Sequence, residues 1–451
     1  MLVPHVRVVR CAPKTHPCPH CGKRGHRKRH LHRRIHSLAY QQVAYLDVHY
    51  AEYKARCSCC KYFRSWPVDV PAKSDYDDLV RNAVLDRILE DGLNVQRALA
   101  AMKRDFFLEL SEGFVYDCLR WKVAQLDLPA HRQMVIEKFS GTLCVDELHL
   151  GRFTLLLATD PIADMPVGFA LVSRNDAGHM RRFLNNLKSW GLLPRVVVSD
   201  GSNLYPAVLA ELWPSARHQL CVFHILKDIN ELLVKAVRRL AYGLARRGHA
   251  GRKRQRGRPS KAQQAARAAA GPTLKDKASF ILKHRFLIVK KSGDLTRQQW
   301  ADLEQMFEYL PQLRTLWYFA CEVRQLFEKE GRVQTLWKRR AALLGNETYQ
   351  AMPELAEAMK MLAADKYKKA VAFVYSQAIE KIRTNNHVER ANRRIRYTEK
   401  LRYKWRRRKW VLRFVLLGLD RWWRQVARAD TQTDQTAAEK QKPPNSRSQA
   451  A

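Results

Sequence analysis

Long apolar runs are absent from this 451-residue sequence, and acidic residues are few. A membrane-spanning helix needs roughly 20 consecutive apolar residues, and no stretch of the chain approaches that length. The first residues, MLVPHVRVVRCAPKTHPCPHC, also lack the apolar core of a signal peptide. These absences argue against a membrane protein and a secreted one, so we expect a soluble protein of the cytoplasm.

The shortage of acidic residues leaves the charge strongly one-sided. Lys and Arg number 82 against 43 Asp and Glu, which gives a formal net charge of +39. Such a charge opposes compaction through self-repulsion unless a polyanion shares the surface. Nucleic acid is therefore the expected partner. The hydrophobic content of 46% is that of a globular protein, and the length suggests roughly two to four domains.

Cysteine is concentrated at the amino end, where six of the ten residues precede position 61. The motif CPHC contributes Cys18 and Cys21, and CSCC contributes Cys57 and Cys60. Each CxxC pair forms a tight turn that directs two thiolates at one ion, and two pairs complete the tetrahedral shell that zinc prefers. We predict a zinc ribbon over residues 1–70 that holds one structural zinc ion, with a β-hairpin within LAYQQVAYLDVHYAEYKARC.

Other arrangements of this region stay open. Cys59 or His20 could replace one of the four ligands, and all the cysteines could instead be free thiols. The basic run from Lys23 to His36 could be a loop or strand that contacts phosphates, or simply a solvated charged face.

Helical periodicity follows the cysteine-rich region. Three short helices are predicted over residues 74–128, in YDDLVRNAVLDRILEDG, NVQRALAAMKRD and SEGFVYDCLRWKVAQL, with Asn94 and Ser111 as N-caps. This spacing is typical of a helix-turn-helix-like segment, whose last helix would bring Arg120 and Lys122 to the major groove of DNA. A plain helical connector between domains is the alternative.

Short, nearly continuous apolar runs begin after residue 140 and predict elements in the order β-β-β-α-β-α-β. Asp146 lies within the first of these strands, and Asp200 ends the fourth. Because adjacent strand ends converge, the two carboxylates could share a divalent metal, and such hard oxygen ligands suit Mg²⁺. Asp200 could also be a turn residue of SDGSN, whereas Asp146 is costly to bury without a partner or a metal.

Paired metal ions are one established way to cleave DNA. Two ions about 3.5–4 Å apart activate a water or a 3′-hydroxyl and stabilise the leaving oxygen during attack on a phosphodiester. This chemistry needs at least one more carboxylate. Composition alone does not choose among the candidates, which include Glu211, Asp228, Glu231 and Glu389.

Together with CVFH and NNHVERANRRIR, these acids give the sequence a resemblance to the ISL3-type transposases of bacterial insertion sequences, members of the DDE group. The resemblance implies an α/β RNase H-like catalytic domain with a large all-helical insertion, preceded by the zinc ribbon and the helix-turn-helix-like segment. It implies that Asp146, Asp200 and Glu389 are the catalytic acids and the ligands of two Mg²⁺ ions. It also gives Cys221, His224 and Asn386 a place as supporting residues near the active site or the DNA. A buried cysteine and a capping histidine are the other roles open to Cys221 and His224.

The family resemblance further implies a biological role and a set of partners. A transposase of this kind binds the terminal inverted repeats of its element in double-stranded DNA, then cleaves and transfers strands. It would act as a homodimer or higher oligomer at the nucleoid of a bacterial cell. Two alternatives share the same motifs: a catalytically inactive, DNA-binding regulator, and an RNase H-type nuclease without strand transfer.

The catalytic region is expected in two parts, residues 138–225 and 379–428. The intervening helical insertion, 226–378, contains a basic loop at 246–272 in which RGRPSK, with Arg258, resembles a minor-groove-binding AT-hook. We expect the tail, 429–451, to be disordered because it is polar and contains proline.

The helix around Glu389 is predicted to separate packing from chemistry. At helical spacing Glu389 shares a face with Asn385 and Asn392, while Val388 and Ile395 lie on a face that can pack inward. A salt bridge to a neighbouring arginine is the other role open to Glu389. Nearby basic side chains are expected to bind DNA phosphates: Arg390, Arg393, Arg394 and Arg396.

Overall fold

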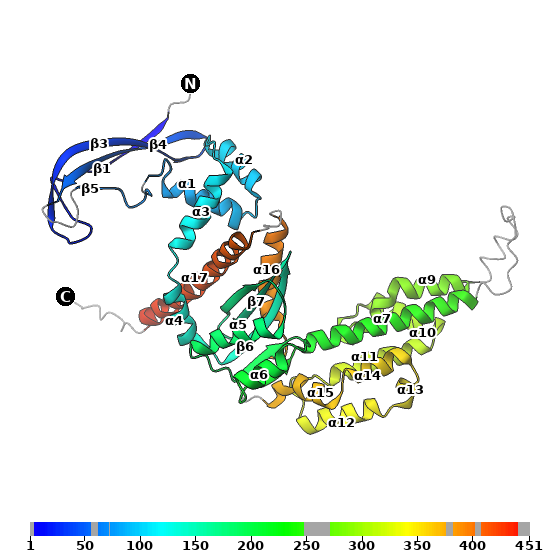
Figure 1. Cartoon of the computed structure of the whole chain (residues 1–451). Coiled ribbons are helices and arrows are strands. Elements are labelled where there is room, and N and C mark those ends of the chain that lie inside the picture. Colours follow the sequence, from blue (N-terminus) through cyan, green and yellow to red (C-terminus); the bar gives the residue numbers. More distant parts are fainter. Residues whose placement is uncertain are drawn as a thin grey trace, which may run out of the picture.

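The computed structural model describes residues 4–55, 62–71, 73–247, 271–375, 382–401 and 407–440, with the backbone alone for 398–401 and 429–440. Figure 1 shows an elongated molecule with a strand-rich amino-terminal part, a central sheet flanked by helices, and an arm of helices that projects from the central sheet. The two segments at the end of the chain return to the central sheet after the arm.

The amino-terminal part is a sheet, and within the described residues it has five strands in the order β1-β4-β3-β2, with β5 also paired to β4. The strands are β1 (His5–Cys11), β2 (Thr15–Pro17), β3 (Arg24–Ala39), β4 (Gln42–Lys54) and β5 (Tyr62–Arg64). Strand β1 runs parallel to β4, and the other pairs are antiparallel.

A long β3–β4 hairpin is the main feature of this sheet. It turns at Gln41, whose φ of 57° is left-handed. The turn and β4 lie in the stretch predicted to form a hairpin, but the first strand lies mostly upstream of it, in the basic run. The basic run lies almost entirely in β3, where Arg27, Arg29 and Arg34 are exposed and Ile35 is buried. Two of these arginines pair across the hairpin, Arg29 with Glu52 and Arg34 with Asp47.

Four helices connect the first sheet to the central one: α1 (Asp78–Leu89), α2 (Val95–Phe106), α3 (Glu112–Ala124) and α4 (Leu128–Lys138). Both predicted N-caps are confirmed, because the Asn94 side chain accepts the backbone N–H of Arg97 and the Ser111 side chain accepts that of Phe114. Helices α1, α2 and α3 share a hydrophobic core, to which Leu417 near the end of the chain also contributes.

The central region confirms the predicted order of elements. They are β6 (Thr142–Leu150), β7 (Phe153–Asp160), β8 (Met165–Val172), α5 (Ala177–Ser189), β9 (Val196–Ser199), α6 (Tyr205–Leu212) and β10 (Arg217–Leu220). The strands form one mixed sheet in the order β10-β9-β6-β7-β8. Strands β6, β7 and β8 are antiparallel neighbours, and β9 and β10 add in parallel on the other side of β6.

The arm between the central strands and the last helices is all helical in its described residues. Its elements are α7 (Val222–Arg247), α9 (Leu274–His284), η1 (Arg285–Val289), η2 (Ser292–Asp294), α10 (Arg297–Tyr309), α11 (Gln312–Gln325), α12 (Val333–Leu344), α13 (Glu347–Gln350), α14 (Pro353–Lys360), α15 (Ala364–Ala370) and η3 (Ala372–Tyr375). It has its own hydrophobic core, separate from that of the central sheet. The arm begins at Val222, four residues earlier than the predicted boundary at 226.

The last helices, α16 (Asn386–Leu401) and α17 (Arg408–Lys440), pack on the central sheet. Helix α17 is held there by two indole N–H groups, of which Trp422 donates to the carbonyl of Asp164 and Trp423 to that of Pro166. None of the helices in the described segments combines the length and the apolar character needed to span a bilayer.

Helix α17 corrects one prediction about the tail. The helix continues to Lys440, so the disorder predicted from residue 429 is wrong for the backbone of 429–440. This segment contains no Pro or Gly before Pro443, so nothing local interrupts a helix that its earlier turns have already nucleated. Residues 441–451 lie outside the described residues.

Candidate active site

Two neighbouring strands bring Asp146 and Asp200 together. Strands β6 and β9 are parallel, and their register pairs Cys144 with Val198. Asp146 and Asp200 each follow a member of that pair by two residues, so they reach the same level on adjacent strands. Asp146, Asp200 and Glu147 each offer a carboxylate oxygen, and these oxygens all lie within 4.8 Å of one another.

Asp146 carries its charge in an unfavourable setting. Burial raises the pKa of this carboxyl to about 7, and the nearby negative charges of Glu147 and Asp200 add to the rise. A hydrogen bond opposes the rise, since Nδ2 of Asn392 donates to Oδ2 of Asp146 at 2.8 Å. A divalent cation at this position would offset the repulsion among the three acids.

Glu147 is held by partners from two other elements. The buried hydroxyl of Tyr205, on the first turn of α6, donates to Oε2 of Glu147. The amide of Asn175 donates to Oε1 at 3.1 Å. The sequence reasoning missed Tyr205 and Asn175; the available signal was the position of Tyr205, in the first turn of the helix that follows Asp200.

Helix α16 is anchored directly to β6 beside Asp146. The side-chain amide of Asn385 donates to the backbone carbonyl of Val145 at 2.7 Å, and Asn392 donates to Asp146 itself. Both asparagines are buried. Because Glu389 lies four residues after Asn385 and three before Asn392, it projects from the same face of the helix.

The inward face of α16 packs as the periodicity predicts. Val388, Ala391 and Ile395 are all buried in the core of the central sheet. A further anchor is His387, whose ring nitrogens lie 2.8 Å from the Thr159 hydroxyl and 2.8 Å from an Asp164 oxygen. The helix therefore has a fixed orientation relative to the strand acids.

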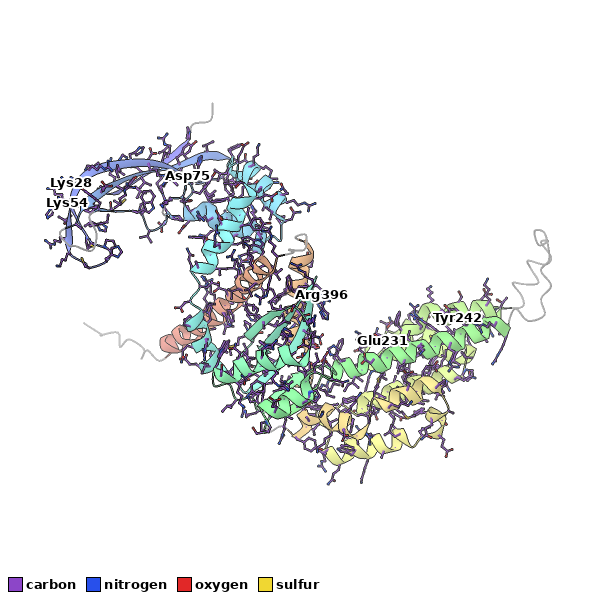
Figure 2. All side chains as sticks on the ribbon, in the orientation of Figure 1. Lys28, Lys54, Asp75, Glu231, Tyr242 and Arg396 are labelled. Carbon is purple, nitrogen blue, oxygen red and sulfur yellow. The ribbon has the colours of Figure 1, made fainter. Side chains whose placement is uncertain are left out.

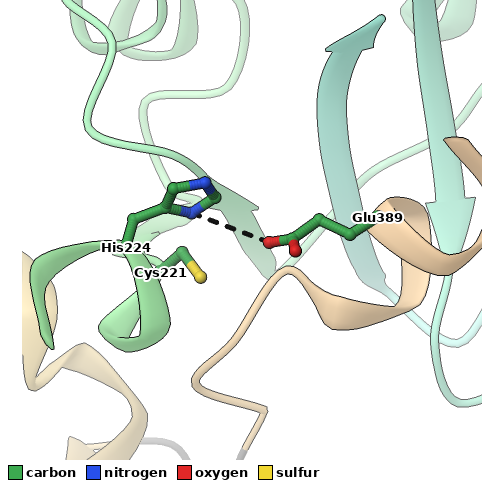
Figure 3. A group of neighbouring side chains, drawn as sticks. All are labelled: Cys221, His224 and Glu389. Atoms are coloured by element: carbon green, nitrogen blue, oxygen red, sulfur yellow. Dashed lines mark ion pairs between the residues drawn. The ribbon is translucent and has the colours of Figure 1, made fainter. Parts of the chain in front are cut away.

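Glu389 belongs to a second group of potential ligands, with Cys221 and His224. One donor atom from each of these residues lies within 4.8 Å of the others. Figure 3 shows Glu389 reaching from α16 toward His224 on the first turn of α7, with His224 Nδ1 and Glu389 Oε1 3.7 Å apart. The adjacent Cys221 side chain, and then the charges of Glu389 and Asp200, hold the pKa of His224 above its ordinary value.

The three predicted acids are thus distributed over two neighbouring groups. Within the described residues, Asp146, Asp200 and Glu389 do not by themselves form a set whose oxygens all lie within 4.8 Å. Asp146 and Asp200 are grouped with Glu147, and Glu389 is grouped with the Cys and His of CVFH.

The arginines predicted to bind DNA form the exposed side of α16. Arg390, Arg393, Arg394 and Arg396 are all exposed, and Figure 2 shows Arg396 on this helix beside the central sheet. Asn386, at the first position of α16, is exposed as well. Basic side chains therefore border the acids on this side of the helix.

Arg120 and Lys122, the basic residues of α3 that were predicted to contact DNA, differ in their present contacts. Arg120 is exposed and pairs with Asp117 on its own helix. The ammonium of Lys122 donates to the side-chain oxygen of Asn82 at 3.1 Å and lies over the ring of Trp121. Lys122 is consequently turned toward its own helical bundle.

The predicted zinc ligands are described only in part. Cys18 and Cys21 flank a tight turn in which the Gly22 N–H donates to the Cys18 carbonyl at 2.9 Å. Cys18 is buried and Cys21 is exposed. The remaining predicted ligands, Cys57 and Cys60, and Arg258 of the basic loop lie outside the described residues.

Comparison with known proteins adds a family assignment. A family model of the ISL3 DDE type, described as a transposase, matches residues 143–410, more than half of the chain. The match spans both groups of potential ligands. No curated protein matches. A solved chain of the Drosophila P element transposase strand transfer complex is similar over 76% of this chain and 90% of its own, at 12% identity with a TM-score of 0.30, a score too low to establish a common fold.

Proposed function

This chain belongs to the ISL3 family of transposases, and from that premise we propose that it binds the terminal inverted repeats of its insertion sequence and catalyses metal-dependent DNA cleavage and strand transfer. The observation that carries the proposal is the meeting of Asp146 and Asp200 on adjacent parallel strands, with their oxygens in one group. The strand arrangement, three antiparallel strands extended by two parallel ones, supports an RNase H-like catalytic domain.

Asp146 and Asp200 would hold divalent metal, and their all-oxygen donor set fits Mg²⁺. The raised pKa of Asp146 supports this fit, because a buried carboxyl near two others gains most from a cation. Bound Mg²⁺ would supply an activated nucleophile and stabilisation of the leaving oxygen. Asn392 keeps the Asp146 carboxylate oriented through its donated hydrogen bond.

Glu389 is proposed as the third acid, supported by its place on the helix that binds β6. Within the described residues its Oε1 is buried and has no hydrogen-bond partner, so this oxygen is available to a metal ion. Glu147 is engaged by Tyr205 and Asn175. We therefore assign Glu147 to positioning and Glu389 to metal binding.

DNA would approach from the exposed side of α16, where its four arginines offer contacts to phosphates next to the one attacked. We propose further DNA contacts from Arg120 and from Arg258 in the basic loop. The helices α1–α3 would serve as the helix-turn-helix-like reader of the inverted repeats. Lys122 would have to release Asn82 before it could contact DNA.

The amino-terminal sheet is proposed as a zinc ribbon, supported by the tight turn that carries Cys18 and Cys21. One structural zinc ion would be held by these two residues together with Cys57 and Cys60. A homodimer or higher oligomer would pair the two transposon ends. Strand transfer in a bacterial cell would take place at the nucleoid.

The test is a cleavage assay on the DNA ends of the element that encodes the chain, with Mg²⁺. Wild type is compared with Asp200→Asn and Glu389→Gln, and binding to the same DNA is measured in parallel. We expect both variants to bind DNA and to lose cleavage by at least about a hundredfold, because each loses a ligand of the metal centre.

The matched control is Asp228→Asn, which changes an exposed acid on α7. It should cleave like wild type. Cleavage by Glu389→Gln at the wild-type rate would overturn the assignment of the third acid. Wild-type protein that binds end DNA and never cleaves it would favour the non-catalytic regulator.

A further inference from the structure

Cys221, His224 and Glu389 form a donor set of a different chemical kind from the strand acids. One atom each of sulfur, imidazole nitrogen and carboxylate oxygen come within 4.8 Å of one another. Figure 3 shows the three side chains converging from the end of β10, the first turn of α7 and α16. Two stretches far apart in the sequence, residues 221–224 and helix α16, thus direct ligand atoms at one point.

Two of these ligand atoms are buried without compensation. Within the described segments, His224 Nδ1 and Glu389 Oε1 are inaccessible to solvent and have no hydrogen-bond partner, although they face each other at 3.7 Å. A buried polar atom without a partner destabilises the folded state, because it has lost its hydrogen bonds to water. An ion between the two atoms would remove both penalties.

The sulfur is placed as a metal-bound thiolate would be. Cys221 is buried and immediately precedes α7, where its carbonyl accepts the N–H of Ile225. The N-terminus of this 26-residue helix favours negative charge beside it. In addition, the backbone N–H of Asn385 donates to Cys221 Sγ at 3.2 Å.

We propose that Cys221, His224 and Glu389 form a binding site for Zn²⁺, distinct from the proposed zinc ion of the amino-terminal sheet. Thiolate and imidazole ligands select zinc over Mg²⁺, which takes hard oxygen donors. Three protein ligands leave the fourth position of a tetrahedral ion open to water.

The site has a consequence for catalysis that rests on the proposed function. Glu389 is shared between the zinc ligands and the proposed Mg²⁺ site, so zinc bound at Cys221 and His224 would hold this carboxylate away from Asp146 and Asp200. Zinc would then inhibit Mg²⁺-dependent cleavage. Zinc binding itself requires neither DNA nor cleavage.

The test measures metal binding to the full chain without DNA. Metal-free protein is titrated with Co²⁺, whose thiolate absorption reports cysteine ligands, and zinc content is measured after dialysis. Wild type is compared with Cys221→Ser and with His224→Asn, which keeps a polar side chain if the serine variant folds poorly. The control is Cys118→Ser, which changes a buried cysteine of α3 outside the group.

Wild type and Cys118→Ser should bind one more ion than Cys221→Ser and His224→Asn, or bind that ion at least about tenfold more tightly. The difference spectrum between wild type and Cys221→Ser should show the absorption of a single thiolate ligand. Equal binding and identical spectra in all four proteins would overturn the proposal. A protein that fails to cleave DNA but shows this difference would retain the zinc site and lose only the proposed function.

Discussion

Removing the charge of Asp146 should stabilise the metal-free protein at high pH. In the folded chain, burial raises the pKa of this carboxyl from its ordinary 3.8 to about 7, with Glu147 and Asp200 adding to the effect. At about 1.36 kcal/mol per pKa unit, this rise corresponds to an upper value of about 4 kcal/mol. Asp146→Asn keeps the size of the side chain and an oxygen that can accept from Asn392, so it removes mainly the unfavourable charge.

The direction in which the free energy of unfolding changes with pH follows from the pKa of Asp146 in the folded and in the unfolded chain. Between about pH 4 and pH 7, the folded protein holds a proton on Asp146 that the unfolded chain has released. The free energy of unfolding of the metal-free wild type therefore falls as pH rises through this window and stays low above it. Asp146→Asn should lack this fall, so the two proteins diverge as pH increases.

Thermal melting in chelator at pH 5 and pH 8 measures the effect. In a domain of 150–250 residues, 1 kcal/mol shifts Tm by about 2–4 °C, so Asp146→Asn should melt up to roughly 16 °C above wild type at pH 8, and by less than half of that difference at pH 5. Added Mg²⁺ should raise Tm of wild type and leave Asp146→Asn nearly unchanged. Asp228→Asn, at an exposed acid, should follow wild type. A variant that melts below wild type at pH 8 without metal would refute the reasoning.

Three further substitutions test one contact of the site, one of the central core and one helix cap. Asn385→Ala removes the hydrogen bond to the buried Val145 carbonyl, and it should cost about 1–3 kcal/mol and lower cleavage by loosening α16, as measured by melting and by the cleavage assay. Gly168→Ala would place a Cβ 2.7 Å from a methyl carbon of Leu187, so a loss of about 1–3 kcal/mol is expected in chemical denaturation. Ser111→Ala removes the cap of α3 and should cost about 1 kcal/mol by the same measurement, whereas Ser111→Asp should retain it.

Local sequence patterns were sufficient to predict features that lie within a single helix or strand. Asn94 and Ser111 cap their helices as predicted, because capping depends on residues within one turn. The buried face of α16, with Val388 and Ile395, follows from helical periodicity alone. The order of strands and helices in the central sheet was predictable in the same way, because each element was recognised from its own local pattern.

Features that depend on docking between distant elements were not predictable in the same way. The pairing of Glu389 with His224 depends on how α16 packs against the sheet after the helical arm. The distance between these two side chains cannot be predicted from the sequence around either residue. The turn of Lys122 toward Asn82 depends on the packing of α3 on α1. By contrast, the meeting of Asp146 and Asp200 was predictable, because parallel neighbouring strands end at one edge of a sheet.

Acids from β6, β9 and α16 are proposed to surround divalent metal, and iron-directed cleavage of the protein shows which residues lie beside the ion. Fe²⁺ bound in place of Mg²⁺, with ascorbate and peroxide, generates hydroxyl radicals that cut the backbone close to the ion. Cuts are expected near residues 146, 200 and 389. Competing Mg²⁺ should suppress these cuts, and Asp200→Asn should lose them. Cuts confined to other parts of the chain, or cuts at these positions that neither Mg²⁺ nor Asp200→Asn affects, would contradict this arrangement.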